Sequence, residues 1–196
     1  MKEKNETIEE TTKERNYELI SLTQDFMFKN VFGKYGNEDI LGKFLSAILN
    51  ENVTKVVIQN GELIKPSKNK KMGILDIRAE IDEKELVDIE IQVENQYNLS
   101  ERCMYYLCKL YSGQLNVSEK YTEIKKSIVI AIIDFDYYDR DEYHSIAHMK
   151  FEENQNENEI ISSKNKRKQQ ELVTDKLEYH VINLKKFREK NETTGC

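Results

Sequence analysis

The stretch that decides the fold runs from Ile74 to Glu94 and reads ILDIRAEIDEKELVDIEIQVE. In each half of it, with few exceptions, the odd-numbered residues are apolar and the even-numbered residues are polar. Side chains of a strand point alternately to its two faces, so this pattern is typical of strands with one apolar face. We therefore expect two strands, at residues 74–81 and 86–94, joined by a short charged turn.

The register of this hairpin follows from the position of its apolar residues. Residues directly opposite each other in an antiparallel pair share a face, so the two apolar sets are buried together only if odd-numbered residues pair with odd-numbered residues. A two- or four-residue turn gives the wrong parity, whereas a three-residue turn at Asp82–Lys84, or a bulge, gives the right one. In that register Asp76 lies opposite Glu90 or Gln92, and two carboxylates and an amide oxygen share one face.

Such a convergence of oxygen atoms is typical of a site for a divalent cation. Two carboxylates held close together repel, and a cation relieves the repulsion. Asp76, Glu90 and the backbone carbonyl of Ile91 can supply the hard oxygen ligands that Mg²⁺ or Mn²⁺ prefers, and Gln92 can orient a water molecule or a phosphate. The corresponding reaction is metal-assisted hydrolysis of a phosphodiester. An antiparallel hairpin with one solvated face shows the same alternation, and periodicity alone favours that simpler interpretation.

The remaining pattern predicts an α/β domain. A polar tail at 1–18 and another at 188–196 flank one domain at 19–187, which contains a long polar loop or insertion at 152–172. Periods of apolar residues predict the other elements. These are helices at 21–32, 37–49 (with Asn37 as its cap) and 99–117, and strands at 53–59, 127–135, 145–151 and 179–184.

Composition limits the classes of function. The chain has 196 residues and a formal net charge of -6, which argues against coating of nucleic acid through bulk charge but allows a local basic groove. No apolar core follows the basic start, and the longest apolar run, Ile128–Ile133, is too short to cross a membrane, so we expect a cytoplasmic protein without a membrane partner. Zinc at His144, His148 and His180 is disfavoured because no cysteine partner has ligand spacing.

Several motifs together resemble one known family. Asp76, followed after thirteen residues by Glu90-Ile91-Gln92, resembles the PD-(D/E)XK nuclease motif. The order of the surrounding motifs is similar to that of the recombination-promoting nuclease/putative transposase family, over about residues 19–187. The similar segments are Thr23–Phe32, Ile40–Leu49, Lys71–Asp76, Gln92–Tyr111 with Arg102, Tyr105 and Tyr106, and Thr174–Lys186.

This resemblance implies a restriction-endonuclease-like, three-layer α/β/α core with a mixed central sheet, and DNA cleavage that depends on a divalent metal. It makes Asp76 and Glu90 the metal-binding acids and places Gln92 at the position of the motif lysine. Leu75 stands where the motif has proline. An amide cannot stabilise a developing charge as an ammonium does, so Lys71 or Lys29 is a candidate to replace the lysine in space.

Other residues are weaker candidates for the same site. Asp25 and Lys29 share a helix face and can approach the site, although a surface ion pair is at least as good an interpretation. Glu38 can reach a metal, but an acid in a first helical turn is more simply explained by the helix dipole.

DNA contacts are expected on the helix that follows the motif and in a basic loop. Arg102, Tyr105 and Lys109 suit a phosphate-and-stacking surface, and packing of the helix on the core is an equally good interpretation. Lys68 and Lys70 belong to a lysine-rich segment that can steer DNA, although such segments are more often merely solvated.

The leading hypothesis is a divalent-metal-dependent DNA endonuclease associated with recombination or transposition. The alternative is a catalytically weak or inactive nuclease-like domain that binds DNA or a protein partner, and a third is a regulatory or self-associating fragment of a larger gene. Cleavage of both DNA strands needs two active sites, which favours a homodimer by symmetry.

Overall fold

The hairpin at the centre of the sequence argument forms as expected. The computed structural model describes residues 25–59, 77–152 and 171–194. Within them, β2 (Ile77–Ile81) pairs with β3 (Glu85–Gln92), and Ile77 lies opposite Ile89. Odd-numbered residues therefore pair with odd-numbered residues, which confirms the predicted parity. Asp76 lies outside the described residues, so its predicted position opposite Glu90 or Gln92 stays a prediction.

The connection between the two strands is the predicted three-residue turn. Ile81 pairs with Glu85, which leaves residues 82–84 as the turn. Asp82 and Glu83 both have positive φ angles, 48° and 60°. The Asp82 carboxylate holds this conformation because its Oδ1 accepts hydrogen bonds from the Thr54 hydroxyl, at 2.7 Å, and from the Lys55 backbone N–H, at 2.8 Å.

The hairpin belongs to a six-stranded mixed sheet. The other strands are β1 (Val56–Gln59), β4 (Lys126–Ile133), β5 (His144–His148) and β6 (Leu177–Asn183). They lie in the order β1-β2-β3-β4-β6-β5. The pairs β3–β4 and β4–β6 are parallel, and the remaining pairs are antiparallel. The central sheet is therefore mixed, as the family resemblance implies.

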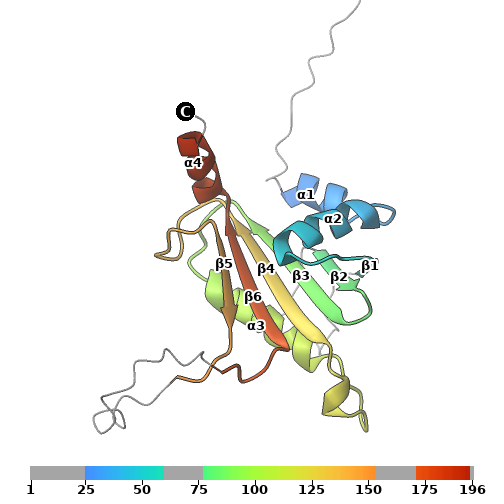
Figure 1. Cartoon of the computed structure of the whole chain (residues 1–196). Helices are drawn as coiled ribbons and strands as arrows, with labels where there is room; N and C mark the ends of the chain where they lie inside the picture. The colour runs from blue at the N-terminus through green and yellow to red at the C-terminus, as the bar shows by residue number, and fades with distance from the viewer. Residues whose placement is uncertain (1–24, 60–76, 153–170, 195–196) are drawn as a thin grey trace, which may run out of the picture.

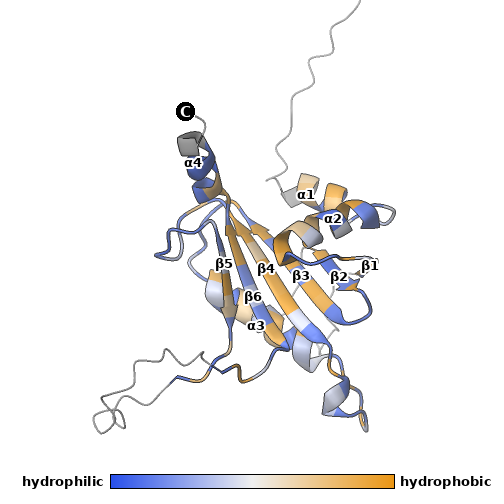
Figure 2. Cartoon of the chain, viewed as in Figure 1, coloured by the Kyte–Doolittle hydropathy of each residue, from blue (hydrophilic) through white to orange (hydrophobic). Residues whose placement is uncertain are grey.

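Helices cover both faces of the sheet and complete the three layers. Helices α1 (Asp25–Phe32) and α2 (Glu38–Leu49) lie on one side, and α3 (Leu99–Ser112) lies behind the sheet (Figure 1). One apolar cluster joins α1 and α2 to the odd-numbered residues of β2 and β3, and a second joins α3 to β4 and β6. Strand β4 is buried on both faces, as its continuous apolar run predicts, and is mainly hydrophobic in Figure 2.

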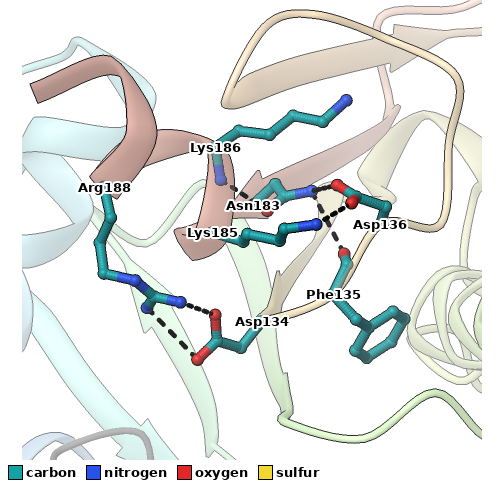
Figure 3. A network of polar contacts seen from close by, with 7 residues as sticks. All are labelled: Asp134, Phe135, Asp136, Asn183, Lys185, Lys186 and Arg188. Carbon is teal, nitrogen blue, oxygen red and sulfur yellow. Dashed lines mark hydrogen bonds and ion pairs between the residues drawn. The ribbon is translucent and has the colours of Figure 1, made fainter. Parts of the chain in front are cut away.

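A helix that the sequence analysis did not predict follows β6. Helix α4 (Leu184–Thr194) includes most of the residues expected to form a C-terminal tail, and it is mainly hydrophilic (Figure 2). Polar contacts attach its first turns to the segment after β4 (Figure 3). Arg188 pairs with Asp134 at 2.5 Å, Lys185 pairs with Asp136, and the Asn183 amide donates to the Phe135 carbonyl at 3.2 Å.

Several predicted boundaries differ from the structure. Strand β1 begins three residues later than expected, α3 ends at Ser112 rather than Val117, and β5 ends at His148. Asn37 is the N-cap residue of α2, but its side chain makes no capping hydrogen bond and donates to the Val31 carbonyl at 2.8 Å instead. A short 3-10 helix, η1 (Tyr121–Glu123), was not predicted. No helix within the described ranges is long and apolar enough to cross a membrane.

Candidate active site

The polar face of β3 is covered by α3. Asp88, Glu90 and Gln92 alternate with apolar residues that belong to the α1–α2 side, so the three polar side chains point to the α3 side. They are 0%, 2% and 7% exposed. The simpler interpretation of the alternation, a hairpin with one solvated face, is therefore wrong for β3. Contact with solvent cannot explain these three polar side chains, because α3 covers them. Burying polar groups costs free energy unless they are paired.

Arg102 of α3 is the partner of two of these residues. Its Nη2 donates to Glu90 Oε2 at 2.9 Å. With its amide oxygen turned toward the guanidinium, Gln92 accepts from the same nitrogen, Nη2, which is the one nearest to it. The sequence analysis assigned Arg102 to DNA phosphate. In the structure its guanidinium faces β3, and the phosphate role stays a prediction.

Asp88 extends the same face by one position toward the turn. It lies opposite Arg78 of β2 in the ladder. Burial lowers the pKa of Arg78, and the negative charges of Asp88 and Glu80 act in the opposite direction. The sequence analysis placed Asp88 on this face but gave it no role. Its full burial beside Glu90 distinguishes it from an ordinary surface acid.

The donor atoms on this face have the chemistry that a divalent cation needs. Asp88 and Glu90 supply carboxylates and Gln92 an amide oxygen, all hard ligands suited to Mg²⁺ or Mn²⁺. In the described part of the chain, no group of three or more His, Cys, Asp or Glu residues is arranged to hold a metal ion. Glu90 and the Ile91 carbonyl therefore fit a metal site only together with further ligands, and Asp76 is the predicted one.

The accessory candidates lie on helices of the other layer. Lys29 is on α1 and Glu38 begins α2, and both helices cover the face opposite to Glu90. The structure therefore does not bring Lys29 or Glu38 together with Glu90 and Gln92. Glu38 Oε2 accepts a hydrogen bond from the Gly36 N–H at 2.8 Å, which agrees with a local role at the start of the helix. Asp25 is the first residue of α1, and Lys71 lies outside the described residues.

The predicted DNA-contacting residues of α3 lie on one flank of the helix, because Tyr105 and Lys109 follow Arg102 by three and seven positions. Tyr105 is 38% exposed, and the Lys109 ammonium lies 5.6 Å from the centre of its ring. The guanidinium of Arg102 faces the sheet. Lys68 and Lys70 lie outside the described residues. Tyr105 and Lys109 therefore form the described part of the predicted DNA surface.

A second polar cluster occupies the face of β6 that belongs to the α1–α2 side. His180 is 1% exposed and hydrogen bonds to His144 at 2.9 Å and to Glu178 at 2.6 Å. Lys126 pairs with the same carboxylate at 3.0 Å. Burial raises the pKa of Glu178, but the hydrogen bonds from His180 and Lys126 outweigh that effect and bring it to about 2. Burial and the nearby His180 lower the pKa of His144.

This histidine cluster is a hydrogen-bonded chain of side chains from β5, β6 and β4. Lys126 could be found only from the sheet order, because it joins the cluster from β4, whereas Glu178 shares the strand face of His180 two positions along β6. Its polar groups satisfy one another within the sheet.

An apolar cavity of about 470 Å³ lies on that same side, between the α1–α2 layer and the start of α4. Ile91 contributes to its wall, and the neighbouring residues Glu90 and Gln92 point to the opposite face. The other walls come from several elements. They include Phe28, Phe44, Ile132, Ile182 and Phe187. None of the described residues that line the cavity carries a carboxylate, and the cavity lies on the other side of the sheet from the polar face of β3.

Comparison with known proteins agrees with the geometry. A family model described as PD-(D/E)XK nuclease family transposase matches residues 22–195. No curated protein and no solved structure matches the chain. The matched region contains the mixed sheet, its helices and α4, and it confirms the resemblance and the restriction-endonuclease-like α/β fold. The chain belongs to the PD-(D/E)XK nuclease family transposases.

Proposed function

We propose that this protein is a DNA endonuclease that depends on a divalent metal and acts in recombination or transposition. Membership of the family supports a nuclease- or transposase-like function in general. The observation that carries the proposal is the buried pair Glu90 and Gln92, side by side on the α3 side of β3 at the motif positions. A buried acid at a motif position is better explained by chemistry than by solubility.

In this proposal each motif residue has a separate role. Asp76, Glu90 and the Ile91 carbonyl hold Mg²⁺ or Mn²⁺, which when bound polarises the phosphodiester and lowers the pKa of a water molecule. Gln92 orients that water or a non-bridging phosphate oxygen. Tyr105 and Lys109 contact the DNA backbone near the site.

The register of the hairpin supports the part of the proposal that concerns Asp76. The pairs Ile77–Ile89 and Arg78–Asp88 have the parity that the prediction for Asp76 requires. A four-residue turn would have put the even-numbered residues of the two strands on different faces. The described residues therefore agree with a shared face for the two motif acids.

Nicking of supercoiled plasmid tests the proposal. The wild-type protein is incubated with plasmid and Mg²⁺ or Mn²⁺, beside Asp76→Asn and Glu90→Gln. Each isosteric change removes one negative ligand, so we expect nicking to fall at least 100-fold, roughly the loss expected when a ligand of a catalytic metal is removed. Activity that persists in both variants, or that survives chelation of the metal, contradicts the proposal.

Stability of the variants must be measured with their activity. Glu90→Gln leaves Arg102 without its carboxylate, so a loss of activity through unfolding has to be separated from a loss through chemistry. We therefore expect the assay to be informative only below the melting temperature of each variant, recorded in chelator. Asp76→Asn is expected to melt no lower than the wild type, since it relieves repulsion between acids.

One observation favours a second candidate function, a domain that binds DNA without cleaving it. Arg102 already occupies one oxygen of Glu90, and Gln92 carries no charge. Both features are compatible with a site that has lost turnover. DNA binding that survives Asp76→Asn and Glu90→Gln, together with no metal-dependent nicking by the wild type, is the result that would support this alternative.

A further inference from the structure

We infer that Arg102 is a positioning residue that takes the place of the missing motif lysine. This inference rests on the proposed endonuclease function and extends it to a residue outside the motif. Its basis is the contact of one guanidinium with both Glu90 and Gln92.

The contact explains why position 92 carries an amide. The Gln92 oxygen accepts from the guanidinium, so the two side chains are complementary as acceptor and donor. A lysine at position 92 is a donor only and carries a positive charge. It would point that charge at Arg102 and remove the acceptor that position 92 supplies to the guanidinium.

The guanidinium also fixes the direction of Glu90. It comes from α3, a helix whose buried residues pack on β4 and β6, so its base is rigid. The arginine side chain is 26% exposed and the Glu90 side chain 3%. A planar fork that binds a carboxylate and an amide at once restricts both rotamers, which a lysine cannot do to the same degree.

If Arg102 has this role, restoring the motif lysine at position 92 reduces nuclease activity. Gln92→Lys would be expected from the motif alone to increase nuclease activity. Here we expect it to reduce nicking at least 10-fold while Arg102 is present. In Gln92→Lys/Arg102→Gln the ammonium replaces the guanidinium beside Glu90 and the new amide can accept from it, so nicking should recover most of that loss.

A double-mutant cycle tests the pair Arg102–Gln92 without any need for activity. The melting temperatures are measured in the presence of a metal chelator. The four proteins are the wild type, Gln92→Lys, Arg102→Gln and the double variant. We expect each single change to lower the melting temperature by roughly 5 °C or more, because each disrupts the contacts of the guanidinium with Glu90 and Gln92. The double variant should lose clearly less than the sum of the two single losses.

A matched control separates this effect from a simple change of charge. Arg140→Gln removes the same charge at an exposed position, where the arginine side chain is 56% exposed and lies 3.7 Å from Glu142. It should change the melting temperature by no more than about 2 °C and leave nicking unchanged. Arg102→Lys should be more active than Arg102→Met, because it keeps the charge although it loses the fork.

The outcomes distinguish the inference from the function on which it rests. Additive losses in the melting cycle overturn the inference, and so does faster nicking by Gln92→Lys in the presence of Arg102. If the wild type does not nick DNA, the proposed function fails, and the melting cycle still decides whether Arg102 and Gln92 form a coupled pair.

Discussion

Glu178 shows how one carboxylate can couple four strands. It accepts from His180 of its own strand, pairs with Lys126 of β4 and lies 3.5 Å from His148 of β5. Lys126 in turn lies 3.7 Å from Glu85 of β3. A charge held by this many partners is more stable in the folded than in the unfolded chain, so folding is linked to its ionisation.

We predict that Glu178→Gln destabilises the protein mainly above pH 4.5. The folded pKa of about 2 is below the ordinary value of 4.5, so the ionised form stabilises the fold at neutral pH. That contribution is lost as the pH falls from about 4.5 toward 2. At pH 7 the variant should lose about 1–2 kcal/mol, a range that allows for solvent screening of a partly exposed group.

Melting temperature recorded against pH checks this prediction. The difference between wild type and Glu178→Gln should be constant above pH 5 and shrink below 4.5. Glu142→Gln is the control, because that side chain is 61% exposed. A difference that stays the same down to pH 2 would show that the ionisation of Glu178 does not contribute.

For single residues, the sequence predicts the strand face on which a side chain lies better than it predicts which side chains contact it. The period of two placed Glu90 and Gln92 on one face, because faces depend only on the residues of one strand. It did not predict that Arg102 contacts both, since that contact depends on how α3 packs over the sheet. For the same reason, the link from His180 to Glu178 and Lys126 could not be read from local patterns.

The turn at residues 82–84 controls the register of the whole hairpin, because its length sets which residues of the two strands lie opposite each other. The structure has the three-residue turn that the sequence predicts. This element was predictable because both strands have a clear apolar face. Helix α4 was not, because its residues are mostly polar and its attachment depends on Asp134 and Asp136, some fifty positions earlier, which bond to Arg188 and Lys185.

We predict that one glycine inserted between Glu83 and Lys84 strongly destabilises the chain. A four-residue turn moves the buried apolar residues of one strand to the opposite face unless a bulge forms. The melting temperature should fall by roughly 8 °C or more, equivalent to several kcal/mol for a chain of this size.

A glycine inserted after Val117 is the control for this insertion, and it opens only an exposed turn in which the Glu119 N–H donates to the Asn116 carbonyl at 3.2 Å. Val117 is 96% exposed and lies in a connection between α3 and η1. Lengthening an exposed loop by one residue costs only tenths of a kcal/mol and opening an exposed turn about 1 kcal/mol, so the melting temperature should fall by no more than about 4 °C. Equal losses from the two insertions would show that pairing parity is not what the turn controls.

For the whole molecule, the proposed function requires an acidic chain to bind a polyanion. The formal net charge of -6 repels DNA at long range, so binding depends on local groups of positive charge. In the described ranges, Lys109 with Tyr105 is such a group near the site. The lysine-rich segment Lys65–Lys71 is the other candidate, on the evidence of sequence alone.

We predict that Lys68→Gln/Lys70→Gln weakens DNA binding mainly by removing phosphate contacts. Each contact with duplex DNA contributes about 0.9 to the slope of log K against log salt concentration, so the slope should become less steep by up to about 1.8. Lys84→Gln/Lys120→Gln removes the same two charges from exposed positions and should leave the slope unchanged. Binding is measured by fluorescence anisotropy with labelled duplex at several salt concentrations. An equal change in both double variants would mean that net charge alone governs binding, and no change in either would remove this segment from the DNA surface.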